Sequence, residues 1–177
     1  MDSQTLGHRR GFVLIEVMVT VVLLSIGLMG LAALHARTTA AQVESYQRIQ
    51  ALLLAQDMAE RIAADKGAAP ALVGDGYGSG PETGCAALTG SALDACNWGN
   101  ALRGTGEKLA GQNAGTLLRG RGCISATAPN RYLVVVAWQG VQRSAAPAAS
   151  CGDGSYGDET LRRTVAVPVH LADLSGT

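Results

Sequence analysis

An unbroken apolar segment dominates the N-terminal part of the chain. Apart from Glu16, residues 12–34 carry no charged side chain, and most of them are apolar. As an α-helix this segment spans about 34 Å at 1.5 Å per residue, which is enough to cross a bilayer. Arg9 and Arg10 precede it, so the N-terminus is expected in the cytoplasm and the remainder of the chain outside.

The apolar periodicity continues beyond this segment. Residues 36–66 lack glycine and proline and repeat apolar positions every three or four residues, which predicts a continuing amphipathic helix. One stripe is expected to pack on a domain: Val43, Tyr46, Ile49, Leu52, Leu53, Ala59 and Ile62. A solvated face is expected for Glu44, Arg48, Asp57, Glu60 and Arg61. Glu44 and Arg48 have the i,i+4 spacing of an ion pair, and Gly67 with Pro70 predicts the end of the helix.

Residues 67–122 have the composition of a glycine-rich connecting region. The stretch GDGYGSGPETG, residues 74–84, predicts a loop, and its glycines lack the spacing of a phosphate-binding loop. Residues 91–102 predict a short helix that carries Trp98 and packs on the domain. Ser91 and Asp94 are its candidate N-caps.

Three segments near the C-terminus have strand character. They are residues 116–127, the β-branched and aromatic run YLVVVAW at 132–138, and residues 161–171. Residues 128–130, Ala-Pro-Asn, predict a turn, and Pro168 favours an edge or bulge position. The predicted fold class is α+β, with a long N-terminal membrane-spanning helix packed on a small antiparallel β-sheet.

Charge and composition narrow the possible functions. The chain of 177 residues has 14 basic and 14 acidic side chains and a sequence pI near 6.8, so no broad basic field attracts nucleic acid. With one Phe, two Trp and four Tyr, few large aromatic side chains are available for the hydrophobic core, so the fold is expected to need further stabilisation.

Four cysteines are candidates to supply this stabilisation: Cys85, Cys96, Cys123 and Cys151. Their spacing matches no zinc-ligand pattern, and their even number after a membrane-directing segment indicates disulfides in an oxidising compartment. Three connectivities are possible, and the sequence does not choose among them. Closure between nearest neighbours, which is the easiest, favours Cys85 with Cys96 and Cys123 with Cys151.

Enzymatic chemistry is not indicated. His8, His35 and His170 lie in the N-terminal segment, at the membrane boundary and in a candidate strand, and form no catalytic pattern with Ser, Cys or Asp. Oxygen ligands for calcium are available from Asp153, Ser155, Asp158 and Glu159. They lack the twelve-residue calcium-loop pattern, so a polar turn is favoured, and no cofactor or metal is expected.

Glu16 distinguishes between a secretory signal, an ordinary membrane anchor and a segment whose acid has a function. A cleavable secretory signal usually has a shorter apolar region and no acid at its head, and an ordinary membrane anchor gives Glu16 no role. A carboxylate within a bilayer costs a few kcal/mol and usually marks a functional pairing. Snorkelling of Glu16 to the headgroups is the simpler alternative.

The stretch Gly11-Phe12-Val13-Leu14-Ile15-Glu16, preceded by two arginines, resembles the leader and mature N-terminus of type IV prepilins and type II secretion pseudopilins. The resemblance implies that prepilin peptidase cuts between Gly11 and Phe12 and that the new amine of Phe12 is N-methylated. It also implies that Glu16 meets this amine in its own chain or in a neighbouring subunit. Such a pairing favours subunits inserted at the correct axial height.

Within this superfamily the chain is most similar to minor pilins of the PilV, or pilus-modification, type. The residues that carry this finer resemblance are 11–34, 41–62, ALDACNW at 92–98 and YLVVVAWQG at 132–140. It implies a low-abundance subunit that primes pilus assembly or caps the tip, with roles in adhesion or twitching motility. A minor pseudopilin of a type II secretion system is the alternative, and a membrane-anchored or secreted envelope enzyme is the alternative from another class.

The resemblance also implies an organisation, a location and partners. The expected parts are a cleaved leader (1–11), the transmembrane and assembly half of the helix (12–34), its amphipathic half (35–66) and a periplasmic or extracellular globular domain (67–177). The protein is expected in the bacterial inner membrane as a single-pass protein and then in the pilus. Its expected partners are prepilin peptidase, other minor pilins, the major pilin and inner-membrane lipid.

Overall fold

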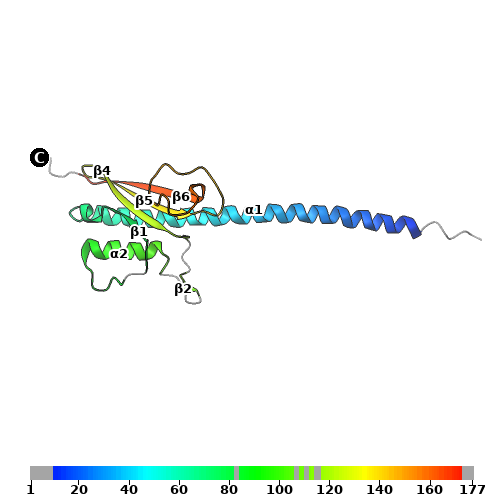
Figure 1. The fold of residues 1–177 in the computed structure, drawn as a ribbon, viewed down its shortest axis with the longest axis horizontal. Coiled ribbons are helices and arrows are strands. Elements are labelled where there is room, and N and C mark those ends of the chain that lie inside the picture. Colours follow the sequence, from blue (N-terminus) through cyan, green and yellow to red (C-terminus); the bar gives the residue numbers. More distant parts are fainter. Residues whose placement is uncertain (1–9, 82–83, 106–107, 110–111, 114–116, 173–177) are drawn as a thin grey trace, which may run out of the picture. The chain divides into compact units, whose positions relative to one another are not determined.

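The computed structural model shows an α+β fold with a long N-terminal helix and a four-stranded antiparallel sheet (Figure 1). The structure describes residues 10–81, 84–105, 108–109, 112–113 and 117–172. Its elements are α1 (Arg10–Ala64), η1 (Ala69–Leu72), β1 (Gly74–Tyr77), α2 (Gly90–Leu102), β2 (Lys108–Leu109), β3 (Gln112–Asn113), β4 (Arg121–Ala128), β5 (Arg131–Gln139), η2 (Glu159–Leu161) and β6 (Arg162–His170). The chain divides into two compact units, residues 1–42 and 43–177, and α1 contributes to both.

Helix α1 is continuous over 55 residues. No proline interrupts it, and it passes through Gly27 and Gly30 without a break. Beyond its last residue, Ala64, the carboxylate of Asp65 accepts the backbone N–H groups of Gly67 and Ala68 at 3.1 and 3.0 Å. The helix therefore ends two residues before the predicted boundary. The side chain of Asp65 stabilises the turn that follows.

The face of α1 that packs in the second unit differs from the predicted stripe. The buried residues of this face are Gln47, Ala51, Ala55, Met58 and Ile62. Five residues of the predicted stripe are instead 40 to 54% exposed: Val43, Tyr46, Ile49, Leu52 and Leu53. The prediction was wrong except for Ile62 and the partly buried Ala59. The cause is that α1 has two apolar faces, and the alanines of the other face let the helix backbone approach the sheet closely.

The sheet has the order β1-β4-β5-β6, and every neighbouring pair is antiparallel. Strands β4, β5 and β6 confirm the three predicted strands, although β4 begins at Arg121 rather than at 116, which lies outside the described residues. Pro129 and Asn130 form the β4–β5 turn, where Asn130 has a left-handed φ of 56°. Pro168 lies on the edge strand β6, as its missing N–H requires.

Alternate residues of β5 serve two cores, as the period of a strand dictates. Val134 and Val136 face the core that includes Met58 and Ile62 of α1. Val135 and Ala137 belong to a smaller cluster that also contains Cys151 and Tyr156, which come from the loop before β6. The helix and this loop therefore cover opposite faces of the sheet.

Strand β1 corrects the prediction of a loop over residues 74–84. Its pairing with β4 sets Gly74 opposite Ile124 and Tyr77 opposite Gly122. Two of its four residues are glycines, so the side-chain pattern of a strand is missing from the sequence. Backbone pairing to β4 needs no side chain, and this is why the segment joins the sheet despite its composition.

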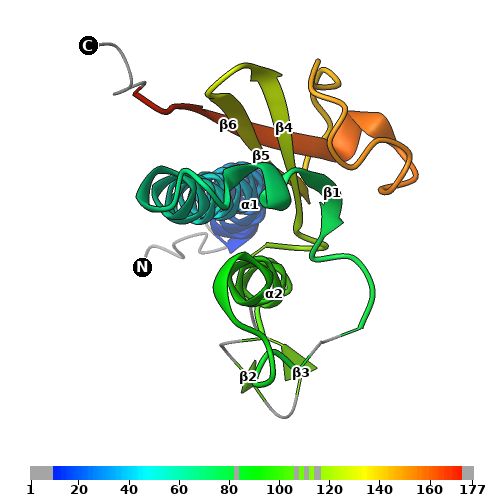
Figure 2. The ribbon, with the colours of Figure 1, turned by 90° about the vertical axis from the view of Figure 1, so that its left-hand side faces the viewer.

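Helix α2 confirms the predicted short helix, but its N-cap residue is Thr89, not Ser91 or Asp94. Asp94 instead accepts a hydrogen bond from Arg61 of α1 at 2.6 Å. Trp98 is 1% exposed, and its indole N–H donates to the backbone oxygen of Leu54 at 2.8 Å. Figure 2 shows α2 and the sheet beside the C-terminal part of α1.

Candidate functional site

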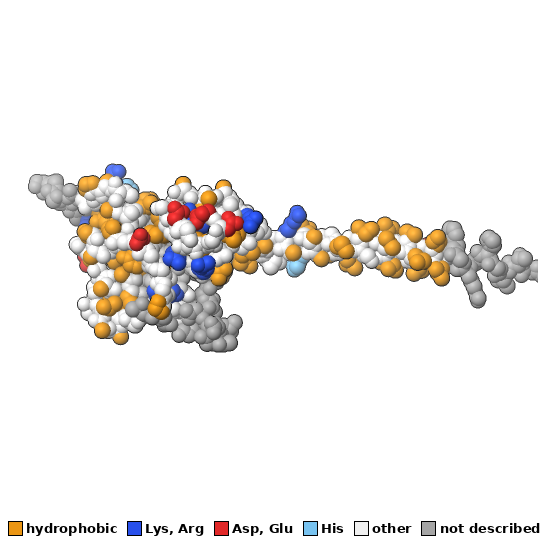
Figure 3. Space-filling view, in the orientation of Figure 1, with side chains coloured by type: hydrophobic (Ala, Val, Ile, Leu, Met, Phe, Trp, Pro, Cys, Tyr) orange, Lys and Arg blue, Asp and Glu red, His pale blue; other side chains and the backbone are white. Residues whose placement is uncertain are grey.

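The N-terminal part of α1 exposes an acid within an apolar surface. Glu16 is exposed, and its neighbours Ile15 and Val17 are 60 and 54% exposed. Hydrophobic side chains cover much of the visible surface of this part of the helix (Figure 3). From Leu14 onward α1 contains an 18-residue window of mean hydropathy 2.5, long and apolar enough to cross a membrane.

Gly11 and Phe12 lie in the first turn of α1, where the structure describes their backbone only. Phe12 and Glu16 are four residues apart, so they share one side of the helix and are separated by about 6 Å along its axis. An amine created at Phe12 would therefore lie within one turn of the Glu16 carboxylate. The first turn also leaves backbone N–H groups without helical acceptors, which adds positive potential at the same end.

A second apolar surface lies further along α1. We call the exposed residues Val43, Tyr46, Ile49, Leu52 and Leu53 the exposed apolar face. These large side chains follow one another at one-turn spacing and remain outside the core of their own unit. A continuous apolar surface of this kind usually marks contact with a protein or a membrane.

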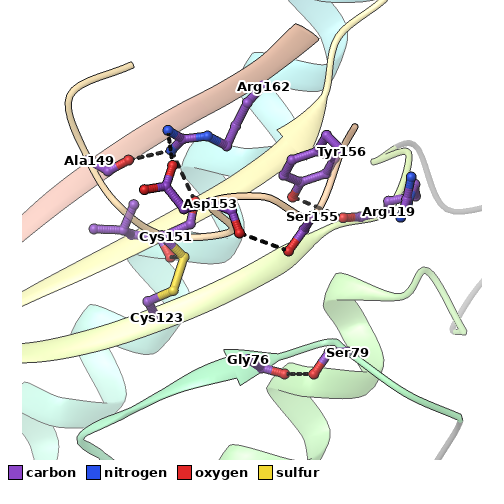
Figure 4. The surroundings of a disulfide bond; sticks show 11 residues. Gly76, Ser79, Arg119, Cys123, Ala149, Cys151, Asp153, Ser155, Tyr156 and Arg162 are labelled. Carbon is purple, nitrogen blue, oxygen red and sulfur yellow. Dashed lines mark hydrogen bonds and ion pairs between the residues drawn. A yellow bond between two sulfur atoms is a disulfide. The ribbon is translucent and has the colours of Figure 1, made fainter. Parts of the chain in front are cut away.

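The structure pairs the four cysteines in two disulfides. Cys85 is bonded to Cys96 and Cys123 to Cys151, each with a Cα–Cα distance of 5.8 Å. These are the nearest-neighbour pairs that short loop closure favours. The first joins the segment before α2 to α2 itself, and the second joins β4 to the loop that precedes β6 (Figure 4).

Arg162 organises that loop, and the sequence analysis did not identify it. The arginine is 3% exposed. Its guanidinium donates to the backbone oxygens of Ala149 and Cys151 and pairs with Asp153 (Figure 4). It also donates to the backbone oxygen of Pro147 and pairs with Glu159. The sequence feature that could have identified Arg162 is its i,i+3 spacing from Glu159, shortly after Cys151.

Tyr156 closes the opposite side of the same loop. Its hydroxyl donates to the backbone oxygen of Arg119 at 3.2 Å, and burial raises the pKa of Tyr156 to about 12. The guanidinium of Arg119 lies 5.7 Å from the centre of the tyrosine ring. The contacts of Tyr156 with Arg119, which lies just before β4, therefore hold this loop in addition to the disulfide.

The candidate calcium ligands have partners within the chain. Asp153 and Glu159 are bound by Arg162, and Asp158 accepts the hydroxyl and the N–H of Thr160 at 2.7 and 2.9 Å. Arg143 lies 3.2 Å from Asp158. Over the part of the chain that the structure describes, no group of three or more His, Cys, Asp or Glu residues is arranged to hold a metal ion.

Acid is expected to loosen this loop. The hydrogen bond from Arg162, followed by that from the Gly154 N–H, lowers the pKa of Glu159. Because the folded pKa lies below the unfolded value of about 4.3, the stabilisation is present above that value and is lost as the pH falls through the folded pKa. Thermal unfolding followed between pH 7 and 3 should show this loss, and Glu159→Gln should reduce the dependence on pH. The exposed Glu60→Gln is the control, and equal pH profiles for the two variants would contradict the assignment.

The described histidines are exposed. His35 lies on α1 and His170 at the end of β6, and His8 lies outside the described residues. The strand position predicted for His170 is confirmed.

Comparison with known proteins gives one match. Residues 6–32 match the family model of the prokaryotic N-terminal methylation motif, which covers Gly11, Phe12 and Glu16. No curated protein and no solved structure matches the chain.

Proposed function

From a motif that indicates a pilin or pseudopilin, we propose that this chain is a minor subunit of a type IV pilus. It primes pilus assembly or caps the tip, and it contributes to adhesion or twitching motility. The observation that carries the proposal is the methylation motif over residues 6–32, at the start of a membrane-length helix. The finer resemblance of residues 92–98 and 132–140 to minor pilins supports the choice within the class.

The proposed sequence of events begins at the cytoplasmic membrane surface. Prepilin peptidase cleaves the bond between Gly11 and Phe12, and the new amine of Phe12 is methylated. Glycine suits this bond because the missing Cβ lets an enzyme approach the backbone closely. The positively charged amine then pairs with Glu16, in the same chain or in a neighbouring subunit, and this pairing sets the axial height of the subunit.

Assembly then uses the helix surface that the subunit leaves uncovered. The exposed apolar face, from Val43 to Leu53, provides the contact with the helices of neighbouring subunits. Burying these side chains between subunits is favourable by about 25 cal/mol per Å² of apolar surface. The membrane-length part of α1, residues 12–34, passes from lipid to filament by exchanging one apolar environment for another.

Mass spectrometry of the mature N-terminus tests the processing step. The expected chain begins with N-methylated Phe12, and Gly11→Trp is expected to reduce cleavage at least about tenfold because a bulky side chain blocks the approach to the backbone. Gly7→Trp, within the same leader but away from the scissile bond, is the control. Recovery of chains that begin at Met1, or near Ala33 or Arg37 as after ordinary signal cleavage, would contradict the proposal.

A pseudopilin of a type II secretion system is the alternative, because it is built on the same motif. Deletion of the gene separates the two. Loss of surface pili with intact protein secretion supports the pilus subunit, whereas loss of secretion with normal piliation supports the pseudopilin.

A further inference from the structure

The disulfide of Cys123 with Cys151 borders an open groove of about 1130 Å³. The groove is lined by β1, β4, β5 and the loop that precedes β6, and both cysteines contribute to its surface. Cys123 is partly exposed, whereas Cys151 is 6% exposed. A small thiol therefore has room to approach the bond from the side of Cys123 while the domain stays folded.

Cys123 is held by the sheet, independently of its sulfur atom. It lies within β4, where its backbone is opposite Val135 of β5, and the pairing continues through Gly122 and Ile124 on either side. This register depends on main-chain hydrogen bonds and on the packing of the sheet, so it does not require the disulfide. Cys123 thus keeps its place when the bond is open.

Cys151 is held by Arg162, also independently of its sulfur atom. The buried guanidinium of Arg162 donates to the backbone oxygen of Cys151 at 3.2 Å and to that of Ala149. Hydrogen bonds from an ionised donor are about twice as strong as those between neutral groups. Cys151 also packs with Val135 and Tyr156 in the smaller core cluster. These contacts hold the residue in the loop without involving the S–S bond.

Turns inside the loop give it a conformation of its own. The N–H of Asp153 donates to the oxygen of Ser150 at 3.0 Å, and the N–H of Ser155 donates to the oxygen of Gly152 at 3.1 Å. Gly152 has a φ of 73°, a backbone conformation that favours glycine. The two turns surround and follow Cys151, so the disulfide joins two segments that other contacts already bring together.

We propose that Cys123 and Cys151 form a reversible thiol–disulfide couple, and that the folded loop keeps the two sulfur atoms together in the reduced state as well. The co-substrate is a thiol. Its thiolate attacks the Sγ atom of Cys123, forms a mixed disulfide and releases Cys151 as a thiolate, which takes up a proton. A second thiolate then displaces Cys123 and leaves as the disulfide form of the co-substrate. Overall, two thiols are oxidised, and the bond in the chain gains two electrons and two protons.

The spacing of the cysteines makes the effect of the loop measurable. Cys123 and Cys151 are 28 positions apart in the sequence. Thiols joined by a flexible chain meet with an effective concentration on the order of millimolar, and a folded loop that positions both raises this value. Arg162 is therefore a positioning residue for the couple. The inference does not rest on the proposed function, because no filament is needed for the exchange.

Equilibration of the full-length chain in detergent micelles with mixtures of reduced and oxidised glutathione tests the proposal. Acid quenching followed by peptide mass spectrometry measures the fraction of the Cys123–Cys151 bond, and hence the effective concentration of its thiols. Arg162→Met is expected to lower this value at least about tenfold, because the loop loses several hydrogen bonds from a charged donor. Arg103→Gln is the matched control, since Arg103 also donates to two backbone oxygens but lies outside the loop, and it should leave the value unchanged.

Alkylation of the reduced chain shows directly whether the loop stays in place. Iodoacetamide should modify Cys151 at least about tenfold more slowly than Cys123 in the native reduced chain, because Cys151 remains buried. The two rates should become similar in Arg162→Met. Tyr156→Phe is the second variant should Arg162→Met fail to fold, because it keeps the ring and removes only the hydrogen bond to the Arg119 oxygen. It is expected to lower the effective concentration about fivefold.

Four results would overturn the inference. Three of them concern exchange with glutathione: a bond that is reduced only when the chain is denatured, glutathione recovered on Cys151 rather than on Cys123, and equal effective concentrations for the unaltered chain and both loop variants. The fourth is equal alkylation of the two cysteines in the native reduced chain, which would show that the loop opens with the bond. None of these results bears on processing at Phe12, so they count against the couple and not against the pilin function.

Discussion

Glu16→Ala is expected to leave cleavage at Gly11 intact and to reduce incorporation of the subunit into filaments at least about tenfold. In the proposed assembly the carboxylate of Glu16 neutralises the amine of Phe12 within an apolar environment. Removing one partner of a buried ion pair leaves an uncompensated charge, which typically costs about 3–5 kcal/mol. Quantifying the protein in filaments sheared from the cell surface, relative to the processed protein in the membrane, measures the effect.

Two variants separate charge from other effects at this position. Thr20→Ala alters the next turn of α1, where the hydroxyl of Thr20 already donates to the Val17 oxygen at 2.8 Å, so it should assemble normally. Glu16→Gln keeps the size and polarity of the side chain but removes the charge, and it should fail as Glu16→Ala does. Normal incorporation of processed Glu16→Ala would remove the assigned role of Glu16.

The helix shows where sequence reasoning succeeds and where it stops. The length and continuity of α1 follow from an apolar run without proline, because local sequence decides them. Local sequence does not determine which face of α1 packs on the sheet. One face has large apolar residues around Ile49, and another has small residues around Ala51 and Ala55. The sheet selects the smaller face because it permits close approach, and that selection depends on tertiary contacts.

The sheet repeats this lesson with different residues. Strand β5 could be predicted from its run of β-branched and aromatic residues. Strand β1 could not, because it pairs through the backbone of a glycine-rich segment that lacks the side chains typical of a strand. Arg162 is a third case, because an arginine at a strand start is ordinarily exposed. Its burial depends on carbonyl groups that lie 11 to 15 residues away in the sequence and come together only in the folded loop.

The residues proposed for assembly also differ from the long-range contacts in how far the sequence predicts them. Gly11, Phe12 and Glu16 form a local motif, so they could be identified from consecutive residues, and the motif match includes them. The ion pair of Glu44 with Arg163 joins residues 119 positions apart, and no local pattern connects them. The expected pair of Glu44 with Arg48 was the closest sequence-based idea, but the structure engages Glu44 with Arg163 instead.

Gly122→Ala is expected to destabilise the globular domain by about 3 kcal/mol, because it overpacks a rigid part of the core. A Cβ at Gly122 would overlap the ring of Trp98 and would lie 2.7 Å from the Cδ1 atom of Leu102. Trp98 cannot withdraw easily, since its N–H is bound to the Leu54 oxygen and its ring lies 5.3 Å from that of Tyr77, centre to centre. Urea unfolding of the mature chain in micelles, followed by tryptophan fluorescence, measures the change.

Matched variants show whether the cause is this steric overlap. Gly84→Ala should be nearly neutral, because a Cβ there would have nothing within 4 Å. Trp98→Leu alone should destabilise by creating a cavity, but in that background the added cost of Gly122→Ala should fall to less than half, since residues in contact have coupled effects. Additive costs in the double variant would show that Trp98 does not impose the glycine. Equal stability of Gly122→Ala and Gly84→Ala would show that α2 and β4 are not packed as closely as the structure has them.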